Sequence, residues 1–117
     1  MTKLAAFLIL GPLILIVGLI YKYYPPKKIN PLYGYRTPRS MKNEDTWQVA
    51  NVYSANLIIA AGLLTCIAQA IFWNTDIETF LIIGLATLLG GLGLSILLTE
   101  MKLKKNFDKE GNRINTQ

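Results

Sequence analysis

The sequence predicts an all-α integral membrane protein, a bundle of three transmembrane helices with a long, ordered cytoplasmic loop between helices 1 and 2. Charged residues make up only 16% of the 117 residues, against about a quarter in an ordinary soluble domain. Most of them gather in two blocks, residues 22–45 and 100–113, which leaves long uncharged tracts elsewhere. Such tracts suit the hydrocarbon core of a bilayer, so we expect a single membrane domain over residues 1–117.

The first span is expected over residues 4–21, an uncharged tract between Lys3 and Lys22. A helix of that length reaches roughly 27 Å, close to the thickness of the hydrocarbon core. The tract ends in Tyr-Lys-Tyr-Tyr-Pro-Pro and lacks the small-residue cleavage pattern of a signal peptide, which favours an uncleaved helix. Pro12 lies inside the tract and removes one backbone donor, so we expect a kink there.

The second span is expected over residues 47–73 and the third over residues 79–99, followed by a basic tail at 100–117. Trp47 and Trp73 stand at the two ends of the second tract, where amphipathic rings favour the headgroup level of the membrane. Asp76 and Glu78 mark a very short turn between the two spans.

The distribution of lysine and arginine predicts the orientation, because cations near the ends of spans stay on the cytoplasmic side. The first loop and the tail are rich in these residues, the second turn has none, and Lys3 is the one weak opposing charge. We therefore expect a multi-pass protein of the cell (plasma) membrane with its N-terminus outside and its C-terminus in the cytoplasm. Because the cations flank apolar tracts, the net charge of +5 indicates membrane lipid as the partner and no direct binding of nucleic acid.

Two stripes at helical spacing are expected to meet protein and not lipid. On the second span the stripe comprises Asn51, Ala55, Ile58, Gly62, Thr65 and Gln69, and on the third it comprises Gly84, Thr87, Gly91 and Ser95. Small residues allow close approach of helices, so the stripe on the third span predicts a homo-oligomer. Packing of the bundle is favoured over a transport path, because no charged residue lies within the expected spans.

The residue types present argue against an enzyme. The chain has no histidine, and its single cysteine, Cys66, lies in an apolar tract. Glu44 and Asp45 are interpreted as charges that complement the start of a helix, with Asn43 as its N-cap. We expect no catalytic residue, no metal site and no cofactor.

The first loop, residues 22–45, is longer than a connection between neighbouring helices needs, and its aromatic residues favour order. Gly34 is expected to adopt a positive φ or to allow a close backbone approach, and Pro38 excludes helical geometry at Thr37. The next helix then begins after Thr37 or after Asn43. Arg36 has two alternatives, contact with a lipid phosphate or an ion pair with Glu44.

This loop resembles the motif of the SdpI/YfhL family. The resemblance rests on Asn30-x-x-Tyr33-Gly34-Tyr35-Arg36-Thr37-Pro38, followed by Ser40, Asn43, Trp47 and Ala50-Asn51. It implies a short, single-module member of a family of bacterial membrane proteins that give immunity to a secreted, SdpC-like peptide toxin. It also implies a role in holding a cytoplasmic repressor at the membrane.

The motif supplies the candidate binding residues, which are Tyr33, Gly34, Tyr35, Arg36, Thr37, Pro38, Asn43, Trp47 and Asn51. Two roles remain open for them, contact with a ligand and attachment of the loop to the bundle. The alternative function is an accessory or transport-associated subunit of a membrane complex, since small-residue helix faces serve any partner.

Overall fold

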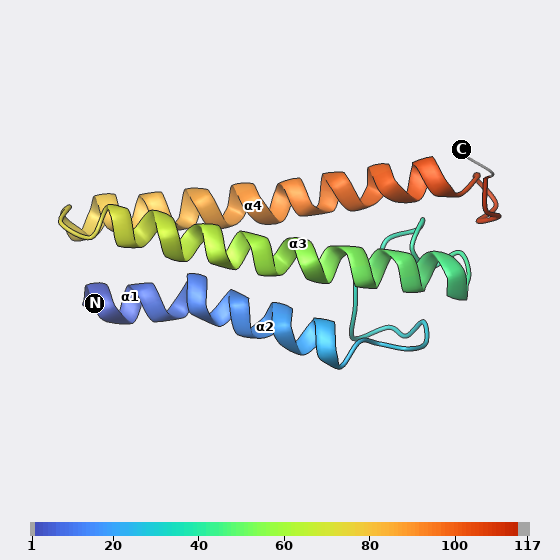
Figure 1. Cartoon of the computed structure of the whole chain (residues 1–117), viewed down its shortest axis with the longest axis horizontal. Coiled ribbons are helices and arrows are strands. Elements are labelled where there is room, and N and C mark those ends of the chain that lie inside the picture. The colour runs from blue at the N-terminus through green and yellow to red at the C-terminus, as the bar shows by residue number, and fades with distance from the viewer. Residues whose placement is uncertain (1, 115–117) are drawn as a thin grey trace.

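The computed structural model describes residues 2–114, so residues 115–117 of the predicted basic tail lie outside the described part. Its helices are α1 (Lys3–Ile9), α2 (Gly11–Tyr23), α3 (Glu44–Ile71) and α4 (Ile77–Asn106) (Figure 1). Within the described residues the only β-type pairing is an isolated bridge between Phe107 and Arg113. Three helical stretches are long and apolar enough to cross a membrane, Lys3–Tyr23, Glu44–Ile71 and Ile77–Asn106, which confirms the predicted class and span count.

The first stretch is broken where the sequence predicts a kink. Pro12 lies in the first turn of α2 and has no N–H to donate to the preceding turn. Leu10 leaves helical geometry with φ −102° and ψ −89°, and its N–H donates to the carbonyl of Phe7. The helix then resumes, because the N–H of Ile14 donates to the carbonyl of Leu10. The break turns α1 relative to α2 without opening the bundle (Figure 1).

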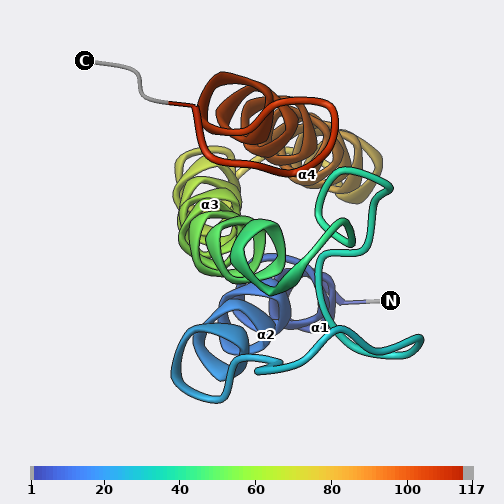
Figure 2. The same ribbon diagram turned by 90° about the vertical axis from the view of Figure 1, so that its right-hand side faces the viewer.

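Helix α3 lies in the middle of the bundle, with α1 and α2 on one side and α4 on the other (Figures 1 and 2). Its predicted protein-facing stripe is confirmed, since all its members are buried except Ile58, which is half-buried. Gly62 shows how closely the helices approach. A Cβ atom at this position would lie 2.8 Å from the backbone nitrogen of Leu15 in α2.

The stripe of small residues on α4 also packs within the chain. A Cβ atom on Gly91 would lie 2.9 Å from the Cβ of Ala61, and Gly84 packs against the side chain of Gln69. This stripe is therefore covered by α3 and is not free for self-association. The homo-oligomer was predicted from this stripe, so that argument does not hold. A homo-oligomer remains a prediction, but it would need a different face.

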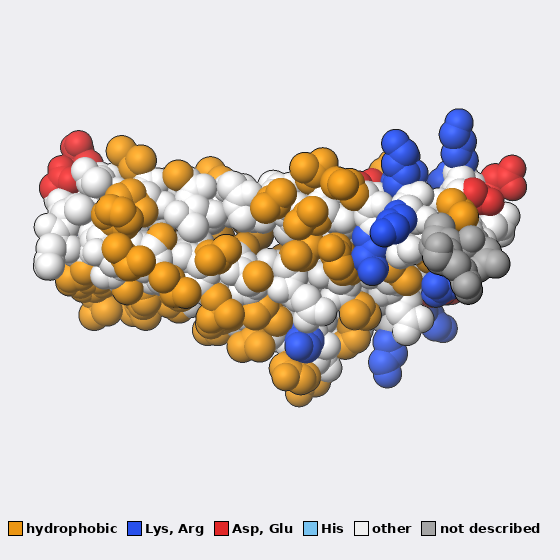
Figure 3. Space-filling view, turned by 45° about the horizontal axis from the view of Figure 1, so that its top comes forward, with side chains coloured by type: hydrophobic (Ala, Val, Ile, Leu, Met, Phe, Trp, Pro, Cys, Tyr) orange, Lys and Arg blue, Asp and Glu red, His pale blue; other side chains and the backbone are white. Residues whose placement is uncertain are grey.

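Helix α4 continues past the predicted end of the third span at residue 99 and stops only at Asn106. The residues after Thr99 are mostly good helix formers, and Lys104 and Lys105 in the last turn complement the negative end of the helix dipole. With 28 and 30 residues, α3 and α4 are about 42–45 Å long, more than the roughly 30 Å of the hydrocarbon core. Apolar side chains cover the middle of the molecule, one end shows acidic side chains alone, and the other shows many cations together with a few acidic groups (Figure 3).

The substitution Gly62→Ala is expected to destabilise the bundle. Its new methyl group meets the backbone of Leu15, which cannot move aside as a flexible side chain would, and overpacking of this kind costs about 1–3 kcal/mol. We expect a lower midpoint of thermal unfolding in detergent micelles, followed by circular dichroism.

Gly93→Ala is the matched control, because a Cβ atom there meets nothing within 4 Å. Alanine also favours helix over glycine by up to about 1 kcal/mol, so the midpoint of this variant is expected to stay or rise. Equal midpoints for the two variants would contradict the close packing of α2 on α3.

Candidate functional site

The segment between α2 and α3, residues 24–43, carries most of the family-like motif and is called the α2–α3 loop below. It runs alongside α3 in the space between α2 and α4 (Figure 2). Its first part is shaped by Asn30, whose side-chain oxygen accepts the N–H groups of Leu32 and Tyr33 at 3.0 and 2.7 Å. The hydroxyl of Tyr33 donates to the carbonyl of Tyr24 at 2.7 Å, so this turn is tied to the end of α2.

Gly34 brings the loop into direct contact with α3. Its φ is +122°, a conformation that L side chains rarely adopt. A Cβ atom would also lie 2.8 Å from the side-chain oxygen of Asn51 and 2.9 Å from the ring of Trp47. Both reasons for a glycine that the sequence suggests, a positive φ and a close approach, are therefore present at this position.

Asn51 holds the backbone of the loop. Its side-chain oxygen accepts the N–H of Tyr35 at 2.6 Å, and its side-chain nitrogen donates to the carbonyl of Trp47 at 2.9 Å. Asn51 is only 2% exposed, so the bond is shielded from water. An irregular backbone needs partners for its polar groups when it lies against an apolar bundle, and Asn51 supplies one.

Trp47 lies at the start of the second span, and its ring packs inside the protein. Its side chain is completely buried under the loop, and its indole N–H donates to the carbonyl of Pro26 at 2.7 Å. A buried tryptophan needs an acceptor for this N–H, and the non-helical Pro25-Pro26 segment offers one. Trp73 at the opposite end is 38% exposed and packs edge-on against Phe80.

Glu100 of α4 fastens the loop from the other side and was not among the residues that the sequence singled out. One of its carboxylate oxygens accepts hydrogen bonds from the hydroxyls of Tyr35 at 2.6 Å and Thr37 at 2.9 Å. Burial, and then the bond to this carboxylate, raise the pKa of Tyr35, so its hydroxyl stays protonated and keeps donating throughout the physiological pH range. The one available signal was an acid placed directly after an apolar tract and before a run of lysines.

The end of the loop is closed by short side chains. Ser40 is fully buried, accepts the N–H of Thr37 at 2.8 Å and donates to the carbonyl of Tyr35 at 2.9 Å. Asn43 and Thr46 form a reciprocal capping box, so α3 begins directly after Asn43, as one of the two alternatives predicted. The side-chain nitrogen of Asn43 also donates to the carbonyl of Gly111 at 2.7 Å, which joins the C-terminal turn to the start of α3.

Arg36 and Pro38 have exposed side chains, as does Tyr33, but unlike Tyr33 they form no side-chain hydrogen bond with the described residues. The pair between Arg36 and Glu44 that the sequence allowed is not formed. Among the described residues the ion pairs are Arg39 with Glu100 at 3.9 Å and Arg113 with Asp45 at 2.6 Å. The candidates thus fall into two groups. Tyr33, Gly34, Tyr35, Thr37, Asn43, Trp47 and Asn51 hold the loop, while Arg36 and Pro38 face outward.

The polar groups of the α2–α3 loop and its neighbours serve mainly to hold the loop in place. Within residues 2–114, no cluster of three or more cysteine, aspartate or glutamate side chains is arranged to hold a metal ion. The groups brought together are hydroxyls, amides and one carboxylate, and their hydrogen bonds are made to one another. What this arrangement fixes is the position of an outward-facing arginine relative to three helices.

Comparison with known proteins places this loop in a family. A sequence model of the SdpI/YfhL protein family matches residues 27–98, which include most of the loop, all of α3 and much of α4. The chain belongs to the SdpI/YfhL protein family. It is 38% identical over 94 residues to the uncharacterized protein YfhL of Bacillus subtilis (strain 168), a match that covers 80% of this chain and 82% of that protein. No solved structure matches the chain.

Asn51→Leu is expected to release the loop. Leucine has the same number and branching of side-chain heavy atoms but leaves the N–H of Tyr35 without its acceptor, at a cost of about 1–3 kcal/mol. The loop contains Arg36 and Arg39, so we expect trypsin to cleave the purified protein after these residues several times faster than in the parent. Mass spectrometry of the fragments identifies the sites.

Asn56→Leu is the matched control, because Asn56 lies on the same helix with an exposed side chain. This variant is expected to be cleaved at the parental rate. If both variants were cleaved alike, Asn51 would not be the residue that holds the loop.

Proposed function

We propose that this protein is a membrane-embedded immunity protein that protects the cell against a secreted, SdpC-like peptide toxin. The observation that carries the proposal is the family match over residues 27–98, since this is a membrane family of the immunity type. The matched region contains most of the loop, including the motif residues that bond to α2, α3 and α4. Most residues of the family motif hold this one loop against the three spans. This supports a function that depends on the position of the loop.

The proposed orientation puts the loop end in the cytoplasm and the turn between α3 and α4 outside. Cations surround the loop end, whereas Asp76 and Glu78 lie at the opposite end (Figure 3). A toxin from outside would then meet the spans and the turn end first. The loop is bonded to α2 through Tyr24 and to α4 through Glu100, so a toxin that changed the spacing of these helices would change the loop.

The outward-facing part of the loop is the surface that we propose for a cytoplasmic repressor. Leu32 is 89% exposed, and Arg36 presents its guanidinium group without an ion-pair partner among the described residues. Arginine is enriched where proteins bind one another, and Leu32 adds exposed apolar area beside it. In this proposal the toxin is met at one end of the bundle and the repressor binds at the other, and protection needs both ends because the loop links α2 to α4.

Arg36→Lys and Arg36→Ala are both expected to lower protection. The planar guanidinium binds a carboxylate or phosphate through two parallel bonds, which lysine cannot reproduce while keeping the charge. In a toxin-sensitive host challenged with an SdpC-like peptide, we expect at least tenfold fewer survivors than with the parent, at unchanged protein abundance. Lys28→Ala is the control, since it removes an exposed cation of the same loop and is expected to protect normally.

Protection by both arginine variants equal to that of the parent, at equal abundance, would remove Arg36 from the proposed function. If the parent itself gave no protection, the immunity proposal would fail, and an accessory subunit of a membrane complex would be the better assignment.

The proposed orientation is tested by reporter fusions. A fluorescent protein that matures only in the cytoplasm is expected to fluoresce when fused after Gln117, and alkaline phosphatase is expected to be inactive there. At the N-terminus the two reporters are expected to behave in the opposite way. The same result at both termini would mean that the number of membrane crossings is even.

A further inference from the structure

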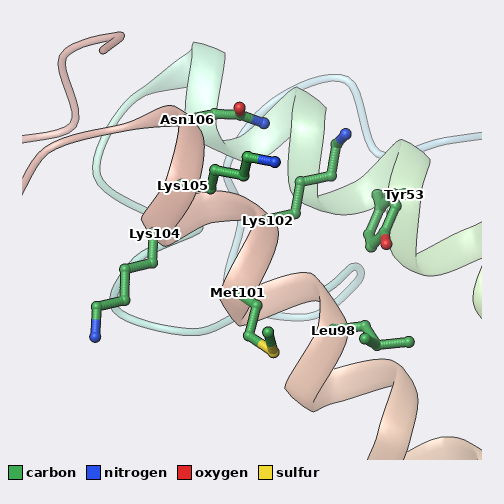
Figure 4. Close-up of a pocket in the computed structure, with 7 residues that line it drawn as sticks. All are labelled: Tyr53, Leu98, Met101, Lys102, Lys104, Lys105 and Asn106. Atoms are coloured by element: carbon green, nitrogen blue, oxygen red, sulfur yellow. The ribbon is translucent and has the colours of Figure 1, made fainter. Parts of the chain in front are cut away.

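The cationic end of the α3–α4 pair holds a hollow that the motif loop does not line. Its volume is about 610 Å³, and it lies beside Tyr53 of α3 and the last turns of α4 (Figure 4). Lys102 and Lys105 extend to the same side of α4 in this view, whereas Lys104 points away. The ammonium group of Lys102 lies 4.9 Å from the centre of the Tyr53 ring, and this contact orients it over the hollow.

An apolar furrow continues from this hollow toward the middle of the membrane. Leu98 lines both, and the furrow, about 80 Å³, runs between α3 and α4 past Ala60, Ala61 and Gly91. It lies beside the close contact of Gly91 with Ala61, where these small side chains leave a shallow groove along the two helices. From Gly91 to Lys102 the helix rises about 16 Å, roughly half of the hydrocarbon thickness and hence the depth of one leaflet.

The charge above the furrow is not neutralised by the described part of the chain. The carboxylates found in ion pairs there are Glu100, with Arg39, and Asp45, with Arg113. Lys102 and Lys105 are thus two ammonium groups near the level at which apolar sequence gives way to charge. That is the level at which lipid phosphates lie.

We propose that the α3–α4 pair binds an anionic phospholipid, with its phosphate at Lys102 and Lys105 and one acyl chain in the furrow over Ala60 and Gly91. The site has the two parts that such a molecule needs in the right order, with cations at the polar end and an apolar groove on their membrane side. A second copy of the chain fits less well, because a symmetric contact here would bring two sets of lysines together. The neutral headgroup of a zwitterionic lipid gains less from these lysines than an anionic one.

Native mass spectrometry of the purified full chain in detergent tests the site. With equal amounts of phosphatidylglycerol and phosphatidylcholine of the same acyl chains, we expect several-fold greater retention of phosphatidylglycerol. The double variant Lys102→Gln, Lys105→Gln is expected to retain it about tenfold less well. The control Lys27→Gln, Lys28→Gln loses the same charge in the loop and is expected to retain it like the parent. Equal losses in the two double variants would overturn the proposal in favour of diffuse charge attraction.

The furrow is tested by Ala60→Leu, which fills it from an exposed position and therefore leaves the bundle intact. We expect reduced retention of phosphatidylglycerol, while Ala86→Leu, at an exposed position on α4 outside the furrow, is expected to have no effect. Full retention by Ala60→Leu, or complete displacement of the lipid by millimolar inorganic phosphate, would show that the acyl chain does not contribute and would overturn the proposal. So would a dimer that forms at this face and excludes the lipid.

Discussion

The buried side chain of Asn51 holds an irregular loop against a bundle built for lipid. Helices satisfy their own backbone groups, but a loop pressed against them needs acceptors and donors from side chains. Asn51 accepts the N–H of Tyr35, and its own orientation is fixed by the carbonyl of Trp47. Gly34 is required because no side chain fits between the loop and this amide. The buried tryptophan, the glycine with its positive φ and the family motif that contains them all depend on this one contact.

The loop also joins helices that meet mainly through α3. Helix α4 packs along α3 and approaches α1 near Leu10, while α2 packs on the other side of α3. At the cationic end, α2 is linked to α4 by way of Tyr33, which bonds to Tyr24, and Tyr35, which bonds to Glu100. The loop therefore connects α2 and α4 across one end of the bundle, and its conformation depends on the relative position of these helices. Arg36 lies between Tyr35 and Thr37, the two residues that bond to Glu100, so the position of its exposed side chain follows that of α4.

Features of the fold could be predicted from the sequence where they depend on residues close together in the chain. Pro12 removes a donor, Asn43 caps a helix, Gly34 takes a positive φ, and gaps between charges mark the spans. The sequence was insufficient where a partner lies far along the chain. Glu100 is 65 residues from Tyr35, so its role could not be recognised from its own surroundings. The indole N–H of Trp47 bonds to the carbonyl of Pro26, 21 residues earlier, and no local pattern marks that partner. The spacing of Gly84 and Gly91 gave their face correctly, but spacing alone does not tell whether the facing helix belongs to the same chain.

The two ends of α3 differ in how well their polar groups are satisfied. Near the loop, Asn51 makes hydrogen bonds with both atoms of its amide. Near the opposite end, Gln69 is fully buried against Gly84, and neither atom of its amide has a partner among the described residues. An unpaired buried amide costs about 1–3 kcal/mol, and this one lies beside Leu10, where the first span is broken. The bundle is thus tightly bonded at the loop end and less well satisfied at the turn end, so a force that separates the helices meets the least resistance at the end opposite the family motif.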